Sequence, residues 1–356
     1  MATAGAPSPS AIDSLDRAGV VPVFYGTNRV RIGTARYGSF GATAGPMRYG
    51  VAYVTIPRGH TVGAIERPNW LLQAVFGENA DRHITIKSIA PLSGDTFFGR
   101  AGGEMARIAA AIRRPRSAML FVHGFNVKFD DAAMRTGQMA HDVGFEGAPF
   151  LFSWPSQGTP FKLTAPTAPY RHDARMIAAS QAPLERFITD VLDRAKPDKL
   201  FIVAHSMGAR GTALALAHLS QTRPDLRRRI AALILAAPDI RQDVFRSVVA
   251  PGLARLAGGV TTYSSSRDRA LMVSAIVNKR YALGDARGGP VIVSPMDMID
   301  VSEVETDWLG HSAYGSEASL LGDIKQIMGG AAASARFGLK RRSSPAGTYY
   351  VYARVR

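Results

Sequence analysis

The strongest constraint on the fold is a short apolar run that ends in a turn of small residues and leads directly into a helix. The run begins at residue 199, the turn over 204–208 reads Ala-His-Ser-Met-Gly, and helix-forming residues fill 209–220. Small residues on both sides of a serine let a strand and a helix pack closely, which is the layout of a nucleophile elbow. We therefore predict that the Ser206 hydroxyl stands above a sheet and that the Met207 amide faces the same point.

The turn departs from the Gly-x-Ser-x-Gly pattern at one position, where Ala204 replaces the first glycine. Alanine adds only one methyl group, so this is the mildest replacement that close packing could accept. A strand, a turn and a helix also follow one another in many α/β proteins that have no catalytic role there. The partners of a catalytic serine must therefore be found elsewhere in the sequence.

Apolar and helical periodicities alternate along most of the chain. Strands are expected over residues 21–30, 49–57, 83–92, 118–126, 149–156, 199–206, 231–239, 260–268 and 290–302. Helices are expected over residues 130–144, 171–195, 209–220, 242–256 and 317–328. From residue 118 onward most strand runs are continuously apolar, as is typical of parallel strands buried on both faces. The order predicts an α/β fold with a doubly wound, mostly parallel sheet and an antiparallel N-terminal edge.

A single domain spanning residues 20–330 accounts for this pattern. Residues 1–19 are rich in Ala, Ser and Pro, and we expect a disordered lead-in because they lack the basic and apolar regions of a signal peptide. Residues 331–356 contain Arg and Lys but no acidic residue, and we expect them to form a basic C-terminal tail.

Composition and charge limit the classes of function. The 356-residue chain has no cysteine, which excludes disulfides, thiolate metal sites and cysteine nucleophiles. A net charge of +15 attracts anionic partners in general. Because no nucleic-acid-binding motif is recognisable, we expect no nucleic-acid partner, and at most a weak contact of the basic tail with anionic surfaces. No apolar run reaches the roughly 18 residues of a membrane-spanning helix. A cytoplasmic location is favoured, and a periplasmic or secreted one stays open.

A serine hydroxyl needs a base to take its proton, and the order of catalytic residues along the chain restricts the choice of that base. In α/β-hydrolases the serine comes first, then the acid and then the histidine. Of eight histidines, only His218 and His311 follow Ser206. His218 falls inside the helix after the elbow, whereas His311 falls in a loop after the last expected strand. We therefore predict His311 as the general base.

Two aspartates are candidates for the acid that orients this histidine. Asp268 ends the expected strand before the last one, and Asp239 ends the strand before that. Either residue could instead cap the helix that follows, which is the commonest role of an aspartate after a strand. We predict Asp268 as the acid, with Asp239 as the alternative.

A second apolar strand, over 119–126, ends in His-Gly and is expected to supply the oxyanion hole. The loop after this strand provides one backbone N–H in this fold, beside the N–H that follows the serine. Gly124 lets the backbone turn inward, so the predicted donors are the amides of Phe125 and Met207, with Asn126 as the alternative. His123 precedes the serine and is expected to shape this loop.

Three further side chains are candidates for the substrate pocket: His205, Tyr170 and Trp154. His205 is expected to pack beside the nucleophile or to line the mouth of the pocket. Core packing is the preferred role for Trp154. The segment 156–170, rich in Pro and Thr, could form part of a lid or pocket wall, or an ordinary surface loop.

Taken together, these motifs resemble those of a known family. The matching pieces are FYGTNR over 24–29, YG over 49–50, IPRGH over 56–60, VHGFN over 122–126, FSWPS over 152–156, AHSMG over 204–208, AAPD over 236–239, SSSRD over 264–268, and His311. The chain resembles a bacterial α/β-hydrolase family of unknown function that is identified with the esterase/lipase superfamily. The resemblance runs from about residue 21 to residue 315 and leaves out the basic tail.

The resemblance implies an α/β-hydrolase fold and a Ser-acid-His hydrolase that needs no metal and no organic cofactor. By motif position, it assigns the nucleophile to Ser206, the acid to Asp268 and the base to His311. We expect a hydrolase that cleaves a small-molecule carboxylic ester through an acyl-enzyme. The same triad would also serve a thioesterase, an amidase or an acyltransferase, and a catalytically idle binding protein of this fold is the alternative from another class. The oligomeric state is left open.

Overall fold

The computed structural model describes residues 19–34, 37–67, 79–159, 167–227, 229–289, 291–304 and 314–353. The strands are β1 (Gly19–Arg31), β2 (Phe40–Ile56), β3 (Thr85–Leu92), β4 (Ser117–Val122), β5 (Ala148–Ser153), β6 (Lys199–His205), β7 (Ile230–Ala236), β8 (Val260–Ser264), β9 (Asp297–Asp300), β10 (Leu339–Ser344) and β11 (Gly347–Tyr352). The α-helices are α2 (Gly94–Ile112), α3 (Phe129–Asp142), α4 (Thr167–Ala179), α5 (Gln181–Asp190), α6 (Ser206–Thr222), α7 (Gln242–Val244), α8 (Ala250–Leu256), α9 (Arg269–Asn278) and α10 (Tyr314–Met328). Short turns of other helix types are η2 (Val191–Ala195), η3 (Pro224–Leu226), η4 (Phe245–Val249), η5 (Ala286–Gly288) and η6 (Ala333–Ala335).

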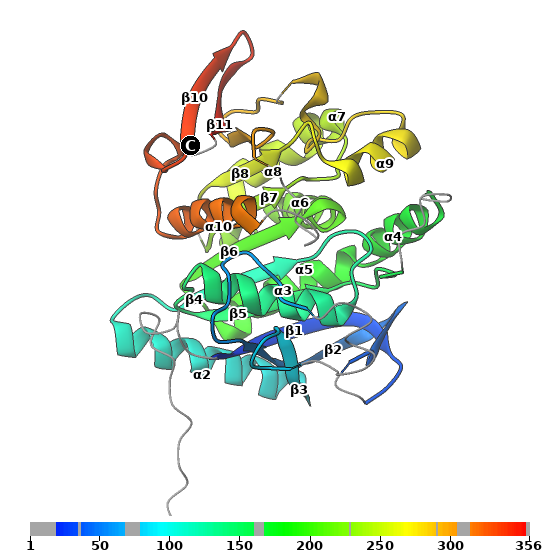
Figure 1. The fold of residues 1–356 in the computed structure, drawn as a ribbon, viewed down its shortest axis with the longest axis vertical. Coiled ribbons are helices and arrows are strands. Elements are labelled where there is room, and N and C mark those ends of the chain that lie inside the picture. Colours follow the sequence, from blue (N-terminus) through cyan, green and yellow to red (C-terminus); the bar gives the residue numbers. More distant parts are fainter. Residues whose placement is uncertain are drawn as a thin grey trace, which may run out of the picture.

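The strands form one sheet in the order β10-β11-β9-β8-β7-β6-β4-β5-β1-β2-β3 (Figure 1). The strands from β1 through β5, β4, β6, β7, β8 and β9 to β11 pair in parallel. Antiparallel pairs lie at both ends, β1-β2-β3 on one side and β10-β11 on the other. The predicted fold class, mostly parallel with an antiparallel N-terminal edge, is confirmed.

Helices cover both faces of this sheet, and the alternation of side chains along the strands creates two core layers. In β4, Leu120 belongs to one layer and Phe121 to the other, since neighbouring residues of a strand point to opposite faces. Helices α2, α5, α6 and α8 contribute to the first layer, whereas α3 and α10 contribute to the second (Figure 1). Burial on both faces explains why the sequence of the central strands is continuously apolar.

Several element boundaries differ from the sequence prediction. The single helix expected over 171–195 is broken near Ser180 into α4, α5 and η2, and the Ser180 hydroxyl donates to the Met176 carbonyl at 2.7 Å. Strand β8 ends at Ser264 and not at Asp268, which is the N-cap of α9. Helices α2 and α9 fall outside the expected ranges. Helix α9 is apolar on nearly every side and so lacks a helical period, whereas α2 is amphipathic and buries Phe97, Phe98 and Met105.

The C-terminal segment differs most from its expected role as a tail. Residues 339–352 form the hairpin β10-β11, and β11 joins the sheet beside β9. Arg336, in front of the hairpin, is fully buried and pairs with Asp323 at 3.2 Å and with Asp297 at 3.4 Å. The domain therefore continues beyond residue 330, because an ion pair and a strand pairing tie this segment to it. Of the expected lead-in, Gly19 begins β1 and residues 1–18 lie outside the described ranges.

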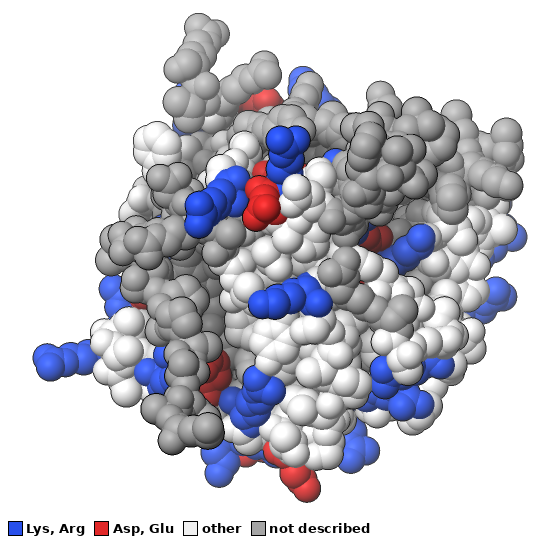
Figure 2. Space-filling model, turned by 60° about the horizontal axis from the view of Figure 1, so that its bottom comes forward, with Lys and Arg blue, Asp and Glu red and all other residues white. Residues whose placement is uncertain are grey.

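Basic side chains are scattered over the face of the molecule drawn in Figure 2. On the face in Figure 2, Lys and Arg stand singly or in small groups among uncharged residues. In the hairpin, residues 340–342 are exposed on the edge strand β10. Charged side chains on an edge strand in general disfavour pairing with the edge of another chain. Within the ranges given above, no helix is long and apolar enough to cross a membrane.

Candidate active site

The turn between β6 and α6 has an unusual backbone. His205 has φ −113° and ψ 134°, the end of an extended strand, and the next residue, Ser206, has φ +51° and begins the helix. Residues with a side chain rarely adopt a positive φ, and such strain persists where the surrounding structure enforces it, often at functional sites. This strand-to-helix turn around a serine is the geometry of a nucleophile elbow.

Two glycines allow the loop after β4 to pack against this elbow. A Cβ atom at residue 208 would lie 2.2 Å from the carbonyl oxygen of His123, so only glycine fits there. A Cβ atom at Gly124 would lie 3.0 Å from the Cβ of Ser206 and 2.6 Å from Nδ1 of His205. The 123–127 segment and the elbow are therefore in direct contact, although about 80 residues separate them along the chain.

His123 and Trp154 support this contact from within the core. Their rings are stacked with centroids 5.1 Å apart, and the Trp154 indole N–H donates to the His123 carbonyl at 2.8 Å. Burial, and then the charge of Arg29, hold the pKa of His123 well below its usual range. His123 is therefore neutral at physiological pH, and the fully buried Trp154 belongs to the core.

Asn126 uses both its backbone and its side chain within the loop region. Its φ is +59°, and its backbone N–H donates to Oδ2 of Asp173 at 2.8 Å. Its side-chain amide donates to the Thr159 carbonyl at 2.7 Å and accepts from the Thr159 N–H at 2.9 Å. The start of the segment 156–170 is thus attached to this loop, while residues 160–166 lie outside the described ranges.

Asp239 lies close to the backbone of the serine but its carboxylate is engaged elsewhere. Its N–H donates to the Ser206 carbonyl at 3.1 Å. Its carboxylate accepts from the Tyr170 hydroxyl at 2.8 Å and from the Ser274 hydroxyl, and Arg210 lies 3.9 Å away. Burial raises the pKa of Asp239, and burial also raises the pKa of Tyr170 to about 12. The Tyr170 ring lies 5.9 Å from that of Phe125, next to the loop after β4.

Asp268 begins α9 at the same edge of the sheet. Its Oδ1 accepts from the Leu271 N–H at 3.0 Å, the usual bond of a helix cap. Strand β8, which leads to Asp268, lies next to β7, and β7 lies next to β6, which leads to Ser206. Because parallel strands end at a common edge, Asp268 and Ser206 both lie at the carboxyl edge of the sheet.

Three histidines are candidate partners or neighbours of Ser206: His311, His218 and His205. His311 lies outside the described ranges, and the last described strand before it is β9, the neighbour of β8. His218 lies on α6 with Nδ1 2.8 Å from the Glu185 carboxylate. Burial, and then the charge of Arg135, lower the pKa of His205 to about 3. His205 is therefore neutral beside the serine.

Sequence reasoning gave no role to Arg29, Ser156 or Asp173, although all three hold the loop after β4 in place. The only signal for Arg29 was its place in the FYGTNR motif, since β1 also contains the polar residues Thr27 and Asn28 and a second arginine, Arg31. Asp173 had no such signal, since one aspartate in an amphipathic helix is ordinary. Among the described residues, no group of three or more His, Asp or Glu side chains is arranged to hold a metal ion.

The sequence of this chain matches a known protein family over most of its length. Residues 104–330 match the family described as "Alpha/beta hydrolase of unknown function (DUF900)". The chain belongs to this family. The resemblance seen in the sequence is thereby confirmed at the level of the family. No curated protein matches the sequence significantly.

Solved structures of similar fold are distant from this member of the alpha/beta hydrolase family. A predicted CIB-like hydrolase from Thermoplasma acidophilum is 14% identical, with 61% of this chain and 88% of the other covered and a TM-score of 0.35. Est1E from Butyrivibrio proteoclasticus, with ferulic acid bound, is 11% identical, with 60% and 88% covered and a TM-score of 0.33. An esterase from the fungus Rhizomucor miehei is 8% identical, with 91% and 85% covered and a TM-score of 0.34. At these identities and TM-scores, the substrates and reactions of the solved proteins cannot be transferred to this chain.

Proposed function

We propose that this alpha/beta hydrolase is a serine hydrolase that cleaves small carboxylic esters, with Ser206 as nucleophile. The observation that carries the proposal is the positive φ of Ser206 at the junction of β6 and α6. A serine in the interior of a helix or strand has no reason to hold this conformation, whereas an elbow requires it. The close approach of Gly124 and Gly208 supports the same interpretation, because both keep the elbow against the loop after β4.

In the proposed reaction, the Ser206 hydroxyl attacks the acyl carbon while His311 accepts its proton. The tetrahedral intermediate collapses, His311 returns the proton to the departing alcohol, and the acyl group stays on the serine. Water then attacks the acyl-enzyme with His311 again as base, and the carboxylic acid leaves as the serine hydroxyl is restored. Asp268 holds the imidazole in the tautomer that accepts from serine.

The proposed oxyanion hole consists of the backbone N–H groups of Phe125 and Met207. Met207 is the second residue of α6, and the first N–H groups of a helix have no partner within the helix. Asn126 is less suited, because its N–H already donates to Asp173. Phe125 is the residue between Gly124, which touches the elbow, and Asn126. Its amide is therefore the proposed second donor.

The proposed acid is Asp268 rather than Asp239. Two hydroxyl groups and Arg210 already surround the Asp239 carboxylate, so an imidazole would have to displace one of these partners. Asp268 follows β8, and the segment that leads to His311 follows the adjacent strand β9. A carboxylate can accept several hydrogen bonds, so the cap of α9 is compatible with a bond from the imidazole.

The first test uses a fluorophosphonate probe and p-nitrophenyl esters of graded acyl length. Wild-type protein is expected to be labelled at Ser206 and to hydrolyse at least one ester, because the probe reacts only with an activated serine. Ser206→Ala is expected to lose both properties with an unchanged melting temperature. Ser343→Ala, an exposed serine in β10, serves as the matched control and should behave as wild type.

Turnover of esters by Ser206→Ala at the wild-type rate would refute the proposal. Folded wild-type protein that neither labels nor hydrolyses would instead favour a binding protein of this fold. Thioester and amide analogues of the best ester distinguish the related activities, since these share the triad and differ in the pocket.

A further inference from the structure

Arg29 is a charged side chain in the interior of the protein. It lies in β1, is 1% exposed, and reaches across to the loops that follow β4 and β5. Its guanidinium donates to the carbonyls of Val127 at 2.8 Å, Ser156 at 2.8 Å and Gly41 at 3.1 Å, and to the Ser153 hydroxyl at 2.9 Å, with His123 Nε2 at 3.4 Å. All these partners, within the described part of the chain, are neutral groups.

Burying a charge among neutral groups is unfavourable, so the arrangement calls for a reason other than stability alone. Burial lowers the pKa of Arg29 to about 9, partly offset by the charge of Asp173. Arg29 therefore remains charged at neutral pH. The planar guanidinium carries five N–H donors in fixed directions, which lets one side chain hold several carbonyls at once.

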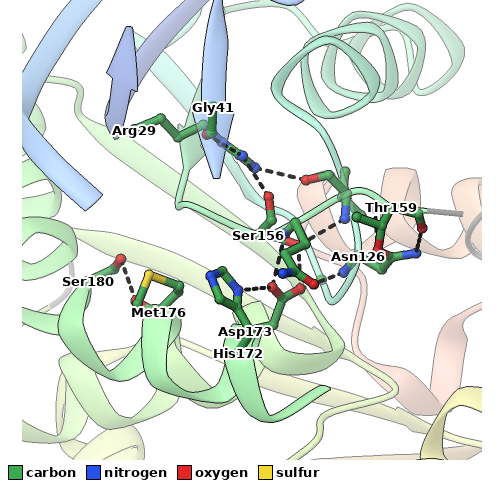
Figure 3. A network of polar contacts seen from close by, with 12 residues as sticks. Arg29, Gly41, Asn126, Ser156, Thr159, His172, Asp173, Met176 and Ser180 are labelled. Carbon is green, nitrogen blue, oxygen red and sulfur yellow. Dashed lines mark hydrogen bonds and ion pairs between the residues drawn. The ribbon is translucent and has the colours of Figure 1, made fainter. Parts of the chain in front are cut away.

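Asp173 holds the same loops from the opposite side. This fully buried residue of α4 accepts from the Asn126 N–H at 2.8 Å, the Ser156 hydroxyl at 2.6 Å and the Gln157 N–H at 2.9 Å. Nδ1 of His172 lies 3.1 Å from Oδ1 of Asp173, the oxygen that also accepts from the Gln157 N–H. Figure 3 shows Arg29 and Asp173 approaching Ser156 from β1 and from α4.

Arg29 and Asp173 therefore hold the peptide units that follow Phe125 by hydrogen bonds, an arrangement that we call the grip. The N–H of Asn126 is bound by Asp173, the carbonyl of Val127 is bound by Arg29, and the N–H of Val127 donates to the Ser156 hydroxyl at 2.9 Å. With these groups fixed, the left-handed conformation of Asn126 is held on both sides. The peptide unit that carries the Phe125 N–H directly precedes these fixed units, so its direction follows from theirs through the backbone of Phe125.

We propose that Arg29 and Asp173 are positioning residues that aim the Phe125 amide at the oxyanion formed on Ser206. This inference rests on the proposed function, because it assigns a catalytic purpose to the loop that the two residues hold. A displacement of the amide by about 1 Å would greatly weaken its hydrogen bond to the oxyanion. The same displacement would have little effect on the binding of the substrate in its ground state.

The experiment compares Arg29→Lys, Asp173→Asn and Ser156→Ala with wild type. For each variant, kcat and KM are measured with the best p-nitrophenyl ester, together with the Ki of an alkyl boronic acid, which forms a tetrahedral adduct with an active serine. We expect kcat to fall by about 10- to 100-fold and the boronate affinity to fall in parallel. KM should change by less than about threefold, since only transition-state binding is affected.

Arg336→Lys is the matched control, because Arg336 is also fully buried but lies by the β10-β11 hairpin. It is expected to lower the melting temperature while leaving kcat and the boronate Ki unchanged. Three variants keep the test valid if one of them does not fold, since each removes a different member of the grip.

Folded variants with lower melting temperatures but unchanged kcat and boronate Ki would show a purely structural role and overturn the inference. Wild-type protein that is not labelled at Ser206 would overturn the proposed function, and the inference with it. The two failures are thus distinguished by the behaviour of wild-type protein.

Discussion

Ser206 has a left-handed backbone conformation, and the packing of neighbouring elements must offset the free-energy cost of that conformation. The cost of such a conformation is about 1–3 kcal/mol, which the packing of the surrounding strands and helices must exceed. The apolar strand β6 and the helix α6 are buried along most of their length, so the turn between them has little freedom. The strain at Ser206 is therefore sustained by the packing of the strand and the helix on either side of it.

The choice between two aspartates is also a question about single residues. Asp268→Asn is expected to lower kcat by about 10⁴-fold with little effect on stability, because an amide would favour the wrong tautomer of His311. Asp239→Asn is expected to keep kcat close to that of wild type and to cost about 1–3 kcal/mol of stability, since its buried hydrogen bonds would be disturbed. Steady-state kinetics and thermal unfolding of both variants check this prediction. The opposite pattern would make Asp239 the acid.

At the scale of elements, the buried side chain of His60 connects the end of α3 to the segment after β2 by hydrogen bonds. His60 lies between two carboxylates, with Nε2 2.7 Å from Asp142 on α3 and Nδ1 2.9 Å from Glu66. Burial lowers the pKa of His60, but the hydrogen bonds to Asp142 and Glu66 outweigh this effect and raise it to about 9. The imidazolium is therefore the stable form in the folded protein at neutral pH.

This raised pKa predicts how stability depends on pH. Because the folded pKa of His60 exceeds its ordinary value of 6.5, its contribution is complete below about pH 6.5 and is lost as the pH rises through about 9. Thermal unfolding of wild type and His60→Gln between about pH 6 and about pH 10 measures it. The two melting temperatures should converge at high pH, and a constant difference would contradict the prediction.

For the whole molecule, the C-terminal hairpin extends the sheet, and a fully buried ion pair lies directly before the hairpin. Arg336 and Asp323 are both fully buried and lie 3.2 Å apart, and the Tyr263 hydroxyl donates to the same carboxylate. Removing one partner of such a pair leaves the other charge buried without compensation. The segment therefore contributes to the stability of the domain as a whole.

Arg336→Ala is expected to destabilise the protein by about 3–5 kcal/mol. Arg342→Ala, which removes an exposed arginine from β10 in the same segment, should stay within about 0.5 kcal/mol of wild type. Chemical denaturation of both variants gives the comparison. Equal effects of the two substitutions would indicate that the segment behaves as a basic tail after all.

Much of the fold could be predicted from the sequence because its signals are local. The alternation of apolar and helical runs, and the turn of small residues around Ser206, depend on residues that are neighbours along the chain. The same local logic failed where elements carry weak patterns. Helix α9, apolar on nearly every side, has no amphipathic period. The break between α4 and α5 lies at Ser180, whose hydroxyl donates to the Met176 carbonyl and accepts from the Asn28 side chain on β1.

What the sequence by itself determined is the alternation of strands and helices through the central part of the chain, the strand-to-helix turn at Ser206 and the membership of an α/β-hydrolase family. What only the tertiary structure decided is which distant groups meet. Arg29 reaches Val127 and Ser156 across 98 and 127 residues, and Arg336 reaches Asp297 across 39 residues. The physical reason is that backbone periodicity is a property of neighbours, whereas the burial and pairing of a charge depend on the three-dimensional packing of the whole chain.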